Sequence, residues 1–282
     1  MSKIGLLVCG NSGIDYIDHD YDIDVIRSIL LVGGNEYTDY VDIEAGDFYQ
    51  MLEDDKSLSP STAQAATAVI YEQYKAMLKK GYDELLVISI SSKLSGTYSG
   101  CVTAGKMIRN AKVTVFDSLT LTYPEAYMGL TAAQMIQDGS NVEEIISALE
   151  KIRDNNHVMF SVATLRYLVK NGRLTGASGF VGSMLKIKPM LEVTKDGRVE
   201  SLEKIRTLKK ATNRLLEKFF DEIEGKNVKA FIISALAHER EEILKKAIKE
   251  KYPEMEINVY PLTPVVGAHA GPGAVGLGYI LV

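Results

Sequence analysis

The first half of the chain alternates between short apolar runs and longer amphipathic segments. The nearly continuous apolar run at 84–90 predicts a strand covered on both faces, 3–9 predicts another buried strand, and further strands are expected at 27–32 and 112–117. Residues 63–80 place apolar side chains at a spacing of three and four and stop before Gly81, which predicts a helix with a glycine after its end. Further helices are expected near 97–109 and, as a pair, across 122–155. This alternation predicts a parallel sheet with helices on both faces.

The second half has a different pattern, with strands that follow one another more closely. Strands are expected at 157–162, 188–194, 199–206, 228–236, 256–262 and 276–282, and KDGR at 195–198 predicts a hairpin turn. Helices are expected at 165–170, 180–185 and 209–224, and a last helix follows the strand at 228–236 and ends at 251. We therefore predict a two-domain α/β protein, with a parallel sheet in 1–158 and a mainly antiparallel sheet in 159–282.

Composition limits the classes of function that remain. The chain has 282 residues, 46% hydrophobic and 24% charged, with a net charge of −5, so nucleic acid is not expected as a partner. No apolar run reaches the length of a membrane span, and residues 1–8 predict a first strand rather than a signal peptide. Cys9 and Cys101 are expected as buried thiols of a cytoplasmic protein.

Common cofactor motifs match only in part. The sequence GPGAVG at 271–276 fits a dinucleotide fingerprint, but only six residues follow it. GCVTAGK at 100–106 lacks the hydroxyl residue that meets Mg²⁺ in a phosphate-binding loop, because Met107 comes next. No metal-ligand cluster or nucleophile elbow is present, so we expect neither a metal nor a cofactor.

Two hydroxyl-rich segments precede predicted helices. The segment at 91–97 is SSKLSGT and follows the end of a buried strand, where parallel α/β sheets bind ligands. Free backbone N–H groups at Gly96, together with the Ser95 hydroxyl, would favour an anion there. The segment at 58–64, LSPSTAQ, contains Ser61 and Thr62. Helix capping by Ser and Thr is the alternative explanation for both segments.

Two further segments add a histidine and a cation. Residues 263–276, TPVVGAHAGPGAVG, predict a glycine-rich loop that includes Gly271 and holds His269 in place. Arg173 follows the short helix expected at 165–170. Together the four segments provide hydroxyls, an imidazole, a guanidinium and two helix N-termini. This set is suited to binding a carboxylate or phosphate, and nothing in it clearly cleaves a bond.

The chain resembles the DegV family over essentially its whole length. The matching pieces occur in the same order: TAQ at 62–64, SSKLSGTY at 91–98, FDS at 116–118, LRYL at 165–168, GR at 172–173, KIKP at 186–189 and GAHAGPG at 267–273. The resemblance implies a two-domain α/β protein that holds one long-chain fatty acid in a tunnel between its domains. Some family members are the binding subunit of bacterial fatty acid kinase and present the carboxylate to a kinase subunit resembling dihydroxyacetone kinase.

The resemblance also assigns roles to residues of this chain. It implies that Thr62 and Ser95 contact the carboxylate and that His269 and Arg173 complete the polar network. Arg206 resembles a surface arginine used for docking to the kinase. The expected ligand-binding set further includes Ser61, Gly96 and Gly271, from the same segments.

The same residues leave two alternatives to fatty acid binding. Ser95 as nucleophile and His269 as base would make a hydrolase or acyltransferase, in which Asp117 could orient the imidazole. Alternatively, the protein is a sensor or partner-binding module in which the lipid is structural.

Overall fold

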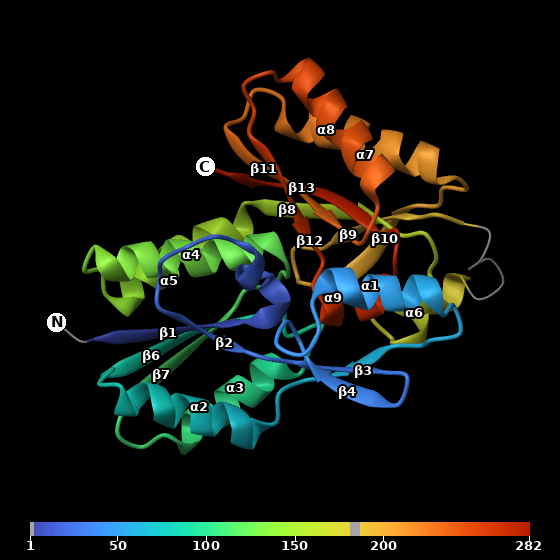
Figure 1. The fold of residues 1–282 in the computed structure, drawn as a ribbon. Helices are drawn as coiled ribbons and strands as arrows, with labels where there is room; N and C mark the ends of the chain where they lie inside the picture. Colours follow the sequence, from blue (N-terminus) through green and yellow to red (C-terminus); the bar gives the residue numbers. More distant parts are fainter. Residues whose placement is uncertain (1–2, 181–186) are drawn as a thin grey trace.

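Three sheets organise the computed structural model, which describes residues 3–180 and 187–282 (Figure 1). The first contains β2 (Ile23–Ile26), β1 (Ile4–Cys9), β6 (Glu84–Ser89) and β7 (Lys112–Asp117) in that order, all parallel. Side chains of β1 alternate between two apolar clusters. Ile4, Leu6 and Val8 pack with one pair of helices, and Leu7 and Cys9 pack with another pair.

Helices cover both faces of this parallel sheet. The helices α4 (Tyr123–Gln137) and α5 (Val142–Asp154) lie on one face, and α2 (Thr67–Lys79) and α3 (Thr97–Met107) lie on the other (Figure 1). Because both faces are covered, the two central strands β1 and β6 are apolar along almost their full length.

The second sheet has six strands. Their order is β10 (Val199–Glu203), β9 (Met190–Val193), β8 (Asn156–Ser161), β13 (Val275–Leu281), β11 (Val228–Ser234) and β12 (Ile257–Pro261). All neighbours are antiparallel except the pair of β11 and β12. The helices α7 (Leu208–Ile223) and α8 (His238–Lys251) cover one face, where Met159, Ile232 and Leu277 are buried. The fold is therefore α/β with one parallel and one mainly antiparallel sheet, as predicted.

A small third sheet covers the opposite face of the six-stranded sheet. It contains β4 (Asn35–Thr38), β3 (Ile29–Val32) and β5 (Ser61–Ala63) and lies beside α1 (Ala45–Asp54), α6 (Arg166–Lys170) and α9 (Pro264–Ala270) (Figure 1). Its core side chain Leu30 shares one apolar cluster with Phe160 and Ile233 of the large sheet. Gly267 allows α9 to approach Tyr49 of α1, because a Cβ there would lie 2.2 Å from the Tyr49 hydroxyl oxygen.

Several local predictions need correction. The glycine-rich segment expected as a loop at 263–276 contains α9, because Pro264 occupies the first helical turn and Thr263 caps it. Thr62 lies in β5, whereas a turn before a helix was expected. The strand expected to reach Arg206 ends at Glu203. The helix expected at 180–185 lies outside the described residues except for Phe180, and the strands β2 and β4 and the helix α1 were not predicted.

The boundary predicted after residue 158 falls inside β8, and the division at that point remains a prediction. Within the described residues, no helix combines the length and the apolar character needed to span a membrane.

An ion-pair cluster fixes α7 to the six-stranded sheet. His157 Nδ1 lies 2.7 Å from a carboxylate oxygen of Glu222 on α7, and its Nε2 lies 2.8 Å from one of Glu192 on β9. Burial disfavours the imidazolium, but the two carboxylates outweigh this effect and raise the pKa of His157 above its ordinary value of 6.5. The interaction therefore stabilises the folded state fully below pH 6.5 and is lost as the pH rises through the raised pKa.

We expect the substitution His157→Gln to lower the free energy of unfolding by roughly 1–3 kcal/mol near pH 6, and by less as the pH rises to about 9. Urea unfolding of both proteins across this range measures the difference. His238→Gln is the matched control, because the His238 side chain is 76% exposed and interacts with a single carboxylate. A difference between wild type and His157→Gln that stays constant with pH would contradict the assignment.

Candidate functional site

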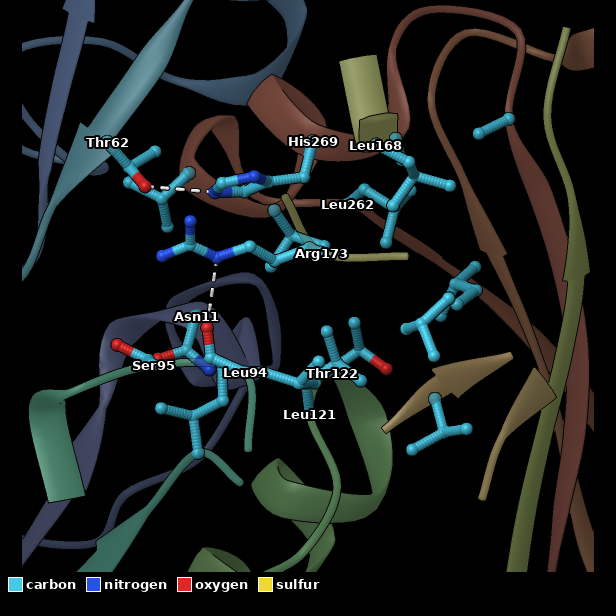
Figure 2. A pocket seen from close by; sticks show the side chains of 18 of the residues that line it. Asn11, Thr62, Leu94, Ser95, Leu121, Thr122, Leu168, Arg173, Leu262 and His269 are labelled. Carbon is cyan, nitrogen blue, oxygen red and sulfur yellow. Dashed lines mark hydrogen bonds between the residues drawn. The ribbon is translucent and has the colours of Figure 1, made fainter. Parts of the chain in front are cut away.

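A cavity lies between the carboxyl ends of the parallel strands, the small third sheet and the inner face of the six-stranded sheet (Figure 2). The space free of protein atoms is about 1010 Å³, including open solvent at its mouth. The lining side chains are mostly apolar; among them are Ile90, Leu94, Leu121, Val158, Phe160, Leu168, Val193, Val199, Ile233, Leu262 and Val265.

Polar side chains gather at one end of this cavity. In Figure 2, Thr62 and Ser95 lie at that end with the guanidinium of Arg173 between them, whereas Leu168 and Leu262 lie towards the other. Five of the seven predicted ligand-binding residues line the cavity: Thr62, Ser95, Gly96, Arg173 and His269. The cavity therefore pairs a polar end with an apolar interior.

Thr62 and His269 are brought together from positions 207 residues apart. The Thr62 Oγ1 lies 2.9 Å from the Nε2 of His269, which is in the last turn of α9. The other ring nitrogen, Nδ1, is buried and has no hydrogen-bond partner among the described residues. Burial and, to a lesser extent, the charge of Arg173 lower the pKa of His269 to about 4. The ring is therefore neutral near pH 7 and can donate one hydrogen bond and accept another.

Arg173 is the cation of the site. It follows α6, and its side chain donates two hydrogen bonds to backbone carbonyl oxygens. The Nε donates to the Leu94 oxygen at 3.2 Å, and the Nη1 donates to the Asn171 oxygen at 2.5 Å. The described residues show no ion pair between Arg173 and a carboxylate of the protein. Its remaining guanidinium N–H groups are therefore free to bind an anionic ligand.

Ser95 and Gly96 immediately precede α3, which begins at Thr97. The Ser95 hydroxyl lies 2.8 Å from that of Thr97 and accepts the backbone N–H of Thr97 at 3.2 Å. Gly96 is exposed and lies close to the side chain of Gln64, because a Cβ on Gly96 would be 2.0 Å from the Gln64 Oε1. The positive end of the α3 dipole thus points at the polar end of the cavity.

Three predicted residues do not line the cavity. Ser61 precedes Thr62 on β5, and successive strand residues point to opposite faces. Gly271 follows α9 with a φ of 77°, and a Cβ there would lie 2.3 Å from the ring of Tyr167, so backbone conformation and packing both favour glycine at this position. Arg206 is exposed on a bend that follows β10.

Two lining residues that were not predicted follow other strands of the parallel sheet. Asn11 follows β1 and is 4% exposed, and its Nδ2 donates to the Glu125 Oε2 at 2.9 Å. Glu125 is fully buried, and this burial raises the pKa of its carboxyl well above the usual value. The nearby Cys9 raises the same pKa to a lesser extent. Thr122 follows β7 and also lines the cavity. Ligands bind at the carboxyl ends of parallel strands, and this rule led to the prediction for 91–97. The same rule could have identified Asn11 and Thr122 from the sequence.

A catalytic Ser-His-Asp arrangement is not assembled here. Ser95 is hydrogen-bonded to Thr97 and His269 to Thr62, and the described contacts include none between Ser95 and His269. The Asp117 Oδ1 accepts backbone N–H groups of Ser92 at 3.1 Å and of Leu119 at 3.2 Å instead of an imidazole. Across 3–180 and 187–282, no group of three or more His, Cys, Asp or Glu residues is suited to holding a metal ion.

A family model and related proteins match this chain over most of its length. A family model described as uncharacterised proteins of the DegV family matches residues 14–282. A DegV domain-containing protein of Halalkalibacterium halodurans is 33% identical over 258 residues, covering 91% of this chain and 90% of the relative. One from Listeria innocua is 31% identical over 264 residues, covering 93% of each.

Two solved structures of similar fold are described as fatty acid binding proteins of the DegV family. DegV from Bacillus subtilis, described as a fatty acid binding protein, superposes with a TM-score of 0.88 at 29% identity and covers 100% of both chains. A DegV family protein of Thermus thermophilus, described by its fatty acid binding, has a TM-score of 0.87 at 27% identity and covers 99% of this chain and 100% of its own. The family model and the relatives agree over nearly the full length, and the chain belongs to the DegV family.

Proposed function

We propose that this protein binds one long-chain fatty acid in the cavity, with the carboxylate at the polar end and the acyl chain in the apolar interior. The observation that carries the proposal is the separation of the lining into these two parts, with a guanidinium at the polar end that forms no ion pair with a carboxylate of the described residues. The Bacillus subtilis and Thermus thermophilus relatives, described as binding fatty acids, support it.

The polar end provides several donors for a carboxylate. Thr62 and Ser95 offer hydroxyls, Gly96 lies at a helix N-terminus, and Arg173 adds a positive charge that no protein carboxylate neutralises among the described contacts. His269 orients Thr62 through their 2.9 Å contact. Hydrogen bonds that involve a charged group are shorter and stronger than neutral ones, so these contacts fix the position of the head group.

Burial of the acyl chain provides most of the affinity. Each buried methylene contributes about 0.8 kcal/mol, so a chain of about 14 methylenes contributes on the order of 11 kcal/mol before the cost of association. The polar contacts then determine orientation more than affinity, and they hold the carboxylate near the mouth of the cavity.

We further propose that the protein is a cytoplasmic carrier rather than an enzyme, and that it presents the carboxylate to a separate kinase subunit resembling dihydroxyacetone kinase. The exposure of Arg173 and Gly96 supports this role, because a partner could reach the head group. Arg206, exposed on the bend after β10, is proposed as a docking residue. The observed contacts of Ser95 and His269 do not favour the alternative of an esterase or acyltransferase.

The first test is native mass spectrometry of the purified protein, followed by denaturing extraction of whatever it holds. We expect one adduct per chain with the mass of a long-chain fatty acid, because the side chains that line the cavity are mostly apolar. A protein that stays free of adduct after incubation with palmitic, oleic and stearic acids would contradict the proposal.

We expect Thr62→Val and Ser95→Ala each to weaken fatty acid binding by about 1.5–3 kcal/mol, the range for a hydrogen bond to a charged group. Displacement of a fluorescent fatty acid measures the change. Ser99→Ala, on the exposed side of α3, is the control and should bind as wild type does. Ser61→Ala tests the role predicted for Ser61, which strand alternation turns away from the cavity. Wild-type affinity in both Thr62→Val and Ser95→Ala would place the carboxylate elsewhere.

Ligand binding should also raise the pKa of His269 from about 4. A bound carboxylate favours the imidazolium and offsets the positive charge of Arg173, and both effects act in the same direction. NMR titration of the ring with and without bound acid measures the midpoint, and Arg173→Gln should raise the midpoint in the ligand-free protein as well. A midpoint that is unchanged or lower with ligand would show that the carboxylate is not near this ring.

A further inference from the structure

Among the residues that the structure describes, the cavity wall includes a hydroxyl that has no hydrogen-bond partner in the protein. Thr122 is 5% exposed and lines the cavity, and its Oγ1 is buried without a hydrogen-bond partner among the described residues. Leaving such a group unpaired destabilises a protein by about 1–3 kcal/mol, so most buried hydroxyls have a partner.

The backbone of Thr122 explains why the hydroxyl is unpaired. Thr122 is the residue before α4, where a threonine hydroxyl ordinarily accepts an N–H of the first helical turn. Thr207 before α7 and Thr263 before α9 do so, with oxygen–nitrogen distances of 3.3 and 3.4 Å. Both have extended backbones, whereas Thr122 has φ 58° and ψ −145°, which turns its side chain away from the helix.

The same conformation is itself unfavourable. A β-branched residue at positive φ is a genuine outlier, and such strain amounts to about 1–3 kcal/mol and gathers at ligand sites. Thr122 thus combines two unfavourable features, backbone strain and an unpaired hydroxyl, at one point of the cavity wall. Neither contributes to capping α4.

The hydroxyl lies in the part of the cavity assigned to the acyl chain. Figure 2 shows Thr122 near Leu121, with its oxygen turned away from Thr62 and Ser95 and from the polar end. An unsubstituted acyl chain placed there would leave the Thr122 hydroxyl unpaired. A chain with an oxygen at the matching position would form a buried hydrogen bond, and sites built for such bonds discriminate strongly against ligands that lack the group.

We infer that Thr122 is a specificity-determining residue that hydrogen-bonds to an oxygen on the acyl chain, so that the cavity prefers a hydroxylated or oxo long-chain acid. This inference rests on the proposed fatty acid binding and names a subclass of its ligand. The carboxylate keeps the contacts described above, and the second oxygen fixes the depth to which the chain enters.

The test compares stearic acid with monohydroxystearic acids that carry the hydroxyl at different carbons, on the wild-type protein and on Thr122→Val. Valine keeps the shape of threonine and removes its hydroxyl. We expect at least one hydroxy acid to bind the wild type about ten-fold more tightly than it binds Thr122→Val, while stearic acid binds Thr122→Val as tightly as wild type or more tightly. Thr122→Ser, which retains the hydroxyl, should keep the preference.

The outcomes separate this inference from the proposal on which it rests. If stearic acid and the hydroxy acids all bind, but their affinity ratio is the same in wild type and Thr122→Val for every isomer, the inference is wrong and fatty acid binding stands. If none of them binds the wild type, both are wrong. Should Thr122→Val not fold, Thr122→Ala measured with the same acids replaces it, and the same ratio decides.

Discussion

The inner apolar face of the six-stranded sheet is the constraint on which the site depends. One face of this sheet is covered by α7 and α8, and the other must also be kept from water. The cover comes from β3, α1 and α9, so side chains as distant in sequence as Leu30 and Ile280 belong to one core cluster. The cover is incomplete, and the space it leaves is the cavity.

Polar contacts join the two halves of the chain around that cavity. Thr62 meets His269, the carbonyl of Leu94 accepts from Arg173, and the Ser91 hydroxyl donates to the Gly197 carbonyl at 2.7 Å in the hairpin turn. Each contact has one partner from the first half and one from the second. A ligand that binds at this seam touches both halves, so its binding also stabilises their packing.

The sequence was most informative where one local rule decides the structure. The strand predicted at 84–90 agrees within one residue with β6, because a nearly continuous apolar run bounded by polar residues has few alternatives. It was least informative in 263–276, where Pro264 and Gly267 indicated a loop. In the structure Pro264 occupies the first turn of α9, and Gly267 lets Tyr49 of α1 approach this helix. The glycine is therefore explained by packing against α1, which the sequence does not reveal.

The sequence by itself determined the parallel sheet, the polar segments after its strands and the resemblance to the DegV family, because these depend on periodicity and on motifs in order. Only the tertiary structure decided that Thr62 and not Ser61 faces the cavity, that His269 reaches Thr62, and that the Thr122 hydroxyl is left without a partner. These features depend on strand register, on backbone conformation and on the approach of segments about two hundred residues apart, which no local pattern specifies.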